Sequence, residues 1–221
     1  MKVRESWTNF SAARLVASIF GVLAGLGGLT HGIGEILQGN TTPSSMFIDS
    51  WTQGPIATHM AGDPAMTVVP NLLITGVLGM VVSLVTIAWA VAFVQRKHGG
   101  FVLILLFLVM LLVGGGFGSP IIGILAGIAG ILNHARITWW RRRFSGSAGR
   151  FLARLWPWLF GIAAINGLFL FVGAIFLVYT FGWGNEDLYL NSFLFAVVSV
   201  SLTIITGIAY DLQSGARVAV S

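Results

Sequence analysis

Two long stretches of the chain contain no lysine or arginine. None occurs between Arg14 and Arg96 or between Arg154 and Arg217, and the residues within both stretches are mostly apolar. With 56% hydrophobic residues, 9% charged residues and a mean hydropathy of +0.90, the chain has more apolar surface than a soluble domain can bury. The sequence therefore predicts a polytopic membrane protein, with residues 1–221 forming a single integral membrane domain.

Six apolar stretches are predicted to form the helices of this domain. A helix needs about 20 apolar residues to cross a hydrocarbon core of about 30 Å. Four stretches meet this length, at about 15–37, 68–94, 157–181 and 191–210. The uncharged stretch 101–133 would be about 50 Å long as one helix. Its glycine-rich run 114–118, followed by Ser119-Pro120, predicts a break that leaves helices at about 100–115 and 120–134.

The basic residues predict how these helices are oriented. Arg96-Lys97 precedes the 101–133 stretch and Arg136 follows it, and positive charge favours the cytoplasmic side. We therefore predict a Gly-rich hairpin between helices three and four of an all-α six-transmembrane-helix bundle, with both termini cytoplasmic. The charges in the two outer loops, 38–67 and 182–190, are all acidic. A re-entrant hairpin with the same sidedness is the structural alternative.

Several function classes lose support from composition and motifs. The net charge of +5 is concentrated in short runs between apolar segments, where the positive-inside rule accounts for it, so no nucleic-acid partner is expected. The chain has no cysteine, which excludes disulfides, thiol nucleophiles and cysteine-ligated metals. It also has no phosphate-binding glycine loop, serine nucleophile elbow or helical zinc motif. Catalysis is therefore not the favoured interpretation.

Two ladders of glycine are expected to pack helices together. Their spacings of three and four residues place them on one face of each helix, where a neighbour can approach closely. The first ladder is Gly21, Gly25, Gly28 and Gly32, and the second is Gly123, Gly127 and Gly130. Their similarity suggests a 3+3 inverted repeat, as in many secondary transporters, although such strings also recur by chance in membrane helices.

The ionisable residues near the outer face are the candidate site. His31 and Glu35 are four residues apart, side by side on the first helix, and an ionisable residue within a membrane helix indicates a functional site. His59 and Asp63 have the same separation in the outer loop. We interpret His31 and Glu35 as an ion or proton site, and all four as an alternative divalent-metal site. Hydrogen-bonded helix-end residues and a solvated loop are the structural alternative.

The 134–156 segment combines arginines with aromatic and aliphatic residues. This mixture predicts a basic amphipathic element on the inner leaflet that contacts anionic lipid headgroups. Its arginines are Arg136, Arg141, Arg142, Arg143, Arg150 and Arg154. A solvated loop and a docking surface for a cytoplasmic protein are the alternatives.

A resemblance extends over roughly residues 20–132. It is carried by Pro64-Ala65-Met66, Pro70-Asn71-Leu72, Gln95-Arg96-Lys97-His98-Gly99-Gly100 and the run Gly114-Gly115-Gly116-Phe117-Gly118-Ser119-Pro120. Over these motifs the chain resembles a group of small bacterial integral membrane proteins without an assigned activity. The resemblance implies bacterial origin and location in the cytoplasmic (inner) membrane, and it transfers no site.

Three functions follow as hypotheses from these observations. The first is a small transport or transport-associated component with its ion or proton site at His31 and Glu35. The second is a non-catalytic scaffold or accessory subunit that packs against partners. The third is a metal-dependent intramembrane enzyme. The sequence identifies no substrate for any of them.

Overall fold

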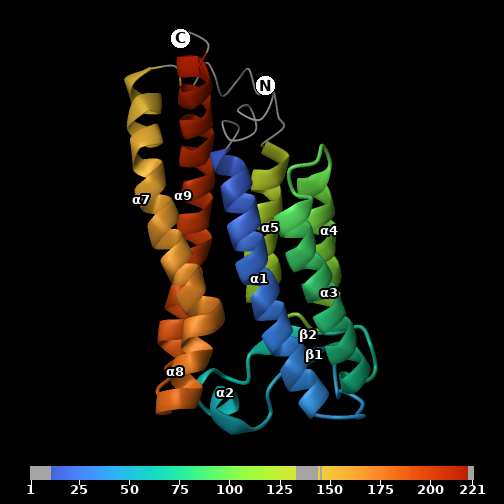
Figure 1. The fold of residues 1–221 in the computed structure, drawn as a ribbon. Helices are drawn as coiled ribbons and strands as arrows, with labels where there is room; N and C mark the ends of the chain where they lie inside the picture. The colour runs from blue at the N-terminus through green and yellow to red at the C-terminus, as the bar shows by residue number, and fades with distance from the viewer. Residues whose placement is uncertain (1–10, 133–143, 145, 219–221) are drawn as a thin grey trace, which may run out of the picture.

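The computed structural model describes residues 11–132, 144 and 146–218. The chain is mostly helical, and its longer helices run roughly parallel (Figure 1). These are α1 (Ala12–Leu37), α3 (Leu72–Ala92), α4 (Gly99–Leu112), α5 (Gly118–Leu132), α7 (Ser147–Leu168) and α9 (Glu186–Val218). We call the end of the bundle where α1 begins the proximal end, and the end where α1 finishes the distal end.

Helix α1 is the centre of the bundle. It packs along α3 and α5, and it also contacts α4, α7 and α9. Its first turn is capped from two directions. The hydroxyl of Ser11 accepts a hydrogen bond from the Arg14 amide, and the Asp211 carboxylate of α9 accepts bonds from the Ala12 and Ala13 amides. This cap fastens the proximal ends of α1 and α9 together.

Glycine lets α1 approach its neighbours closely. Gly21 lies against Ala90 of α3, Gly25 against Ile87, and Gly32 against the backbone of Gly76. A Cβ at any of these positions would come within 3.0 Å of α3, so the close packing depends on the missing side chains. Gly28 lies against Ser83 and Met110, while Gly123, Gly127 and Gly130 lie against α4 and the residues before it.

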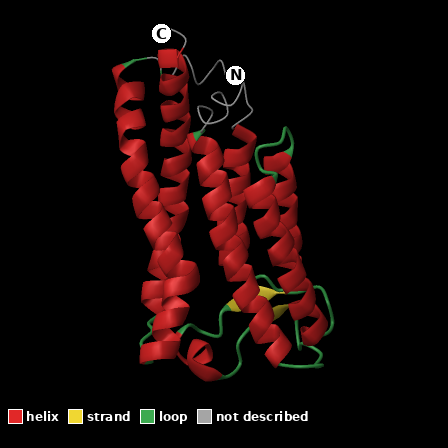
Figure 2. Ribbon diagram, viewed as in Figure 1, coloured by secondary structure: helices red, strands yellow, loops and turns green. Residues whose placement is uncertain are grey.

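The α4–α5 hairpin turns at residues 113–117, as the glycine-rich run predicts. Its turn is covered by the loop between α1 and α3, where β1 (Phe47–Asp49) pairs antiparallel with β2 (Pro64–Met66) (Figures 1 and 2). The Gly114 amide donates to the Met66 carbonyl, and the Val68 amide donates to the Leu112 carbonyl. The same loop contains the short helix α2 (Gly54–His59). The hairpin turn is therefore held against a structured loop at the distal end.

The fifth apolar stretch is one continuous helical rod with an irregular turn. α7 is followed by a π-helical turn, η1 (Phe169–Gly173), and by α8 (Ala174–Phe181). α7 begins at Ser147, ten residues before the predicted start, so the arginines at 150 and 154 extend the rod beyond its apolar part. Asn166 binds Ser192 of α9 through its side chain, and this contact holds the two rods together.

Four helical segments are long and apolar enough to cross a membrane. These are 12–37, 72–92, 147–181 and 186–214. α4 and α5 have 14 and 15 residues, or about 21–23 Å of helix, and each is shorter than a hydrocarbon core of about 30 Å. The structure thus has four candidate membrane spans and a shorter apolar hairpin, which indicates a membrane protein, while six complete crossings stay a prediction.

Two further predictions concern the all-α fold class and the inverted repeat. The sequence predicts an all-α fold, but the outer loop contains the β1–β2 pair, so the fold is mostly and not purely helical. The inverted repeat also stays a prediction. α1 packs extensively against α3, whereas α5, its counterpart in such a repeat, makes no comparable contact with α7 among the described residues.

Candidate functional site

A cluster of polar side chains is buried at the distal end of the bundle. His31 and Glu35 lie one turn apart on α1 and are 4% and 0% exposed. The loop supplies Ser50, directly after β1, and Asp63, directly before β2; these are 0% and 6% exposed. His31 and Glu35 therefore face protein. The β1–β2 pairing then brings both loop residues to the same place.

Two hydrogen bonds and one ion-pair contact connect these four residues in a row. The Ser50 hydroxyl lies 3.2 Å from Glu35 Oε1 and 2.8 Å from His31 Nδ1. On the other side of the imidazole, His31 Nε2 lies 3.2 Å from Asp63 Oδ2. The Tyr189 hydroxyl of α9 donates to Asp63 Oδ1 over 3.5 Å. We call the row Glu35–Ser50–His31–Asp63 the polar chain, and it links two carboxyl groups through one hydroxyl and one imidazole.

One end of the polar chain has an unused oxygen. Glu35 Oε2 is buried and has no hydrogen-bond partner, which is costly for a carboxylate in a low-dielectric surrounding. Gly114, in the turn of the α4–α5 hairpin, lies directly against this carboxyl group. Glu35 therefore has a buried carboxyl oxygen at which it can hold a proton.

Asp63 is held in an uncommon backbone conformation. Its φ of 55° follows a φ of 51° at Ala61 and 72° at Gly62, so three successive residues lie in the left-handed region. Asp and Gly tolerate this region, whereas Ala is strained in it. Such local strain often accompanies a functional side chain that must point in one direction. Here it directs Asp63 toward His31.

Burial also changes the acidity of Asp63. Loss of hydration raises the pKa of its carboxyl group above the usual 3.8, while His31 and the hydrogen bond from Tyr189 partly counteract the rise. The Asp63 side chain is therefore easier to protonate than an exposed aspartate. This property suits a group that takes up and releases protons.

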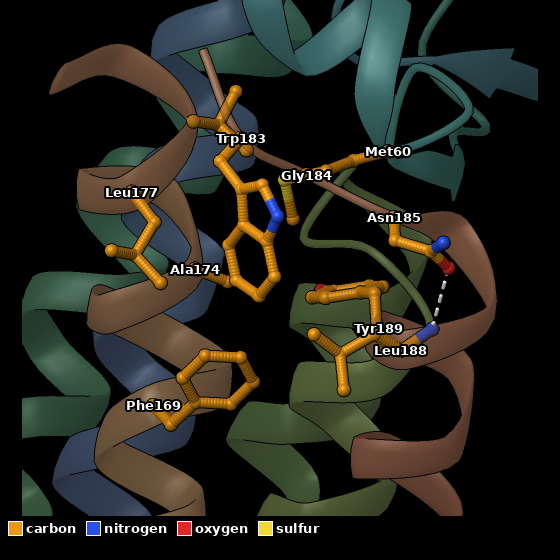
Figure 3. Close-up of a pocket in the computed structure, with 10 residues that line it drawn as sticks. Met60, Phe169, Ala174, Leu177, Trp183, Gly184, Asn185, Leu188 and Tyr189 are labelled. Carbon is orange, nitrogen blue, oxygen red and sulfur yellow. Dashed lines mark hydrogen bonds between the residues drawn. The ribbon is translucent and has the colours of Figure 1, made fainter. Parts of the chain in front are cut away.

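A small cavity of about 10 Å³ lies beside the polar chain. Asp63, His31, Thr30, Ser119 and Tyr189 provide its polar lining, and Gly27 and Phe171 lie deeper in the bundle. A second, apolar pocket adjoins it between α8 and the start of α9 (Figure 3). Tyr189 lines both spaces, and the Asn185 side chain accepts the Leu188 amide at the second pocket's edge. The polar chain thus borders a polar space on one side of Tyr189 and an apolar one on the other.

His59 is separate from the other predicted site residues. It lies at the end of α2 with its Cβ close to Gly184, and no described hydrogen bond or ion pair joins it to His31, Glu35 or Asp63. In the part of the chain that the structure describes, no group of three or more His, Cys, Asp or Glu side chains is arranged to hold a metal ion. Three of the four predicted ligands therefore meet, but in a hydrogen-bonded row.

Only two of the six arginines predicted to contact lipid lie among the described residues. Arg136, Arg141, Arg142 and Arg143 lie outside the described residues, as do the other residues of 134–143 and residue 145 of the predicted 134–156 segment. Arg150 and Arg154 lie on the first turns of α7, at the proximal end.

Sequence reasoning missed two residues of the site. Ser50 is the central link of the polar chain, and Tyr189 binds its Asp63 end. Neither has a recognisable spacing to His31 in the sequence. Only the folding of the loop over α1, and the packing of α9 beside it, bring them into contact.

Comparison with known proteins gives no assignment: no protein family, curated protein or solved structure matches this chain. The function must therefore be inferred from the site itself.

Proposed function

We propose that the protein is a small membrane transport component in which the polar chain conducts protons between Asp63 and Glu35. One observation carries this proposal. Two buried carboxyl groups on different segments are joined through Ser50 and His31, by hydrogen bonds of 3.2 and 2.8 Å and an ion-pair contact of 3.2 Å. Ionisable groups are expensive within a membrane bundle and are retained there mainly for function.

The polar chain allows two arrangements of the same protons. In the first, Glu35 is ionised, Ser50 donates to it, His31 donates to Ser50 through Nδ1, and Asp63 carries a proton shared with Nε2. In the second, Glu35 is protonated and donates to Ser50, Ser50 donates to Nδ1, and Nε2 donates to ionised Asp63. Passing between them moves one proton from Asp63 to Glu35 without displacing a heavy atom, because hydroxyl and imidazole groups both donate and accept.

The charge distribution suggests how the relay is oriented. Arg14, Arg96 and Arg150 lie at the proximal end, whereas Asp49 and Glu186 lie at the distal end. By the positive-inside rule, we propose that the proximal end faces the cytoplasm and that all six apolar helices belong to the membrane domain. Together with the resemblance noted above, this favours a bacterial inner membrane. The polar chain would then exchange protons with the outside.

Proton flux into vesicles tests the proposal. The purified protein is reconstituted into liposomes that contain a pH-sensitive dye, and a potassium diffusion potential set with valinomycin drives proton entry. We expect the wild-type protein to conduct and the variants Glu35→Gln and Ser50→Ala to lose conduction. Ser199→Ala is the matched control, since Ser199 is also buried but donates to the Ala196 carbonyl of its own helix.

One observation supports the alternative hypothesis of a scaffold or accessory subunit. Every described polar group of the row except Glu35 Oε2 has a partner, so the row also fastens the distal loop to α1. If wild-type vesicles conduct no faster than empty ones while Ser50→Ala lowers thermal stability, the row is a structural fastening and the transport proposal fails.

A further inference from the structure

A pocket far from the polar chain opens between α7 and α9 at the proximal end. It has a volume of about 230 Å³. Two facing stripes of residues form it, one from each helix. They are Arg150, Ala153, Arg154 and Pro157 on α7, and Tyr210, Gln213 and Ser214 on α9.

The pocket carries positive charge without a local counter-ion. Arg150 and Arg154 form no ion pair within the part of the chain that the structure describes. The nearby carboxylate of α9, Asp211, is already engaged with the Ser11 hydroxyl and with the Ala12 and Ala13 amides. Two guanidinium groups one helical turn apart can therefore address the same anion.

Hydrogen-bond donors complete the lining opposite the arginines. Tyr210 has its ring packed against Trp156 at a centroid distance of 4.8 Å, which fixes the direction of its phenol. Gln213 is held by a bond from its amide to the Phe144 carbonyl, and Ser214 adds a second hydroxyl. Arginine, phenol and hydroxyl groups together match the oxygens of a phosphate.

In the proposed membrane orientation, the position of the pocket on α7 matches the depth of lipid phosphates. Immediately beyond it, α7 exposes large apolar side chains, with Trp158 75% and Ile165 72% exposed. An exposed tryptophan at the start of such a face marks the boundary between hydrocarbon and headgroups. Arg150 and Arg154 precede this boundary, on the headgroup side.

We propose that this pocket binds the phosphodiester headgroup of an anionic phospholipid. The two arginines hold the phosphate oxygens, Tyr210 and Ser214 donate to the remaining acceptors, and the acyl chains lie along the apolar face of α7. Basic pockets between membrane helices bind such headgroups. The site is independent of the polar chain, which lies at the opposite end of the bundle.

Native mass spectrometry of the full chain in detergent tests this site with phosphatidylglycerol as the probe. The variant Arg150→Gln/Arg154→Gln should bind the lipid about tenfold more weakly, because two charge-assisted contacts are lost. Ala153→Phe fills the pocket while keeping both arginines, and it should weaken binding similarly. Arg96→Gln/Lys97→Gln removes the same charge at the α3–α4 turn and should bind like wild type. Thermal melts identify variants that do not fold.

Two competitors separate the sources of phosphate. Phosphatidylcholine has the same phosphodiester but no net charge, and inorganic phosphate has no acyl chains; neither should displace phosphatidylglycerol. Displacement by inorganic phosphate would make this a soluble-anion site and overturn the lipid proposal. The lipid proposal is also overturned if Arg150→Gln/Arg154→Gln or Ala153→Phe binds phosphatidylglycerol like wild type. It is overturned as well if Arg96→Gln/Lys97→Gln weakens lipid binding as much as Arg150→Gln/Arg154→Gln does.

Discussion

Gly116 lies directly against the imidazole of His31. A Cβ at this position would come within 3.0 Å of the ring, and the φ of +75° is itself unfavourable for any residue with a side chain. The neighbouring Gly114 has the same relation to the Glu35 carboxyl group. The glycine-rich turn of the α4–α5 hairpin is therefore one wall of the polar chain as well as a break between two helices.

Placing an L-residue in the left-handed region costs about 1–2 kcal/mol. We expect Gly116→Ala to destabilise the protein by more than this amount. The added methyl group must also displace the His31 ring, which breaks its alignment with Asp63. Thermal unfolding in detergent measures the first effect and vesicle proton flux the second. Gly118→Ala is the control, since a Cβ there meets Phe193 at an ordinary 3.5 Å. Equal melting temperatures for the two variants would contradict this prediction.

The raised pKa of Asp63 predicts how stability depends on pH. A carboxyl group with a raised folded-state pKa stabilises the fold while it is protonated. Its contribution is complete below pH 3.8, the usual pKa, and is lost as the pH rises through the higher folded-state pKa. Asparagine mimics the protonated form at every pH. The melting temperature of wild type relative to Asp63→Asn should therefore fall as the pH rises.

A matched charge variant checks this pH dependence. Asp49 is exposed on β1, so Asp49→Asn removes a carboxylate outside the polar chain. If both variants show the same pH dependence relative to wild type, the effect comes from overall charge and not from burial of Asp63.

The strained backbone at Ala61 predicts a stabilising substitution. Ala61 is exposed with a φ of 51°, so Ala61→Gly removes no packing and relieves the left-handed strain, for a gain of up to about 1 kcal/mol. The same exchange at Ala57, inside α2, should cost about 1 kcal/mol because glycine is a poor helix former. A higher melting temperature for Ala61→Gly and a lower one for Ala57→Gly would support backbone strain at Ala61. Shifts of the same sign for both variants would refute it.

The helical fold follows from the sequence because hydropathy and length are local properties. The stretch 15–37 matches α1 closely, and the glycine run places the hairpin turn correctly. The start of α7 could not be read in this way. Arginines end an apolar stretch, but they are good helix formers, so α7 continues past the predicted membrane boundary.

Only part of the candidate site could be predicted from the sequence. His31 and Glu35 are related by helix periodicity, which a sequence displays directly. Their connection through Ser50 depends instead on how the loop folds over α1. Loop pairing likewise brings Asp63 inward and leaves His59 against Gly184, although the two residues are only four apart. Asp211 caps α1 because helix packing brings it to the Ala12 and Ala13 amides, a contact that no sequence spacing indicates.

The last prediction concerns sidedness, which the absence of native cysteine makes simple to measure. Cysteines introduced at His98 and Gly146 are exposed at the proximal end, one on each side of the α4–α5 hairpin. Cysteines at Ser44 and Glu186 are exposed at the distal end. Because the hairpin returns the chain to its starting side, a membrane-impermeant maleimide applied to intact cells should label only the distal pair. The proximal pair should react with the maleimide only after the membrane is permeabilised. Labelling of His98 and Gly146 from opposite sides would mean that 99–132 crosses the membrane once, and it would remove the outward-facing relay.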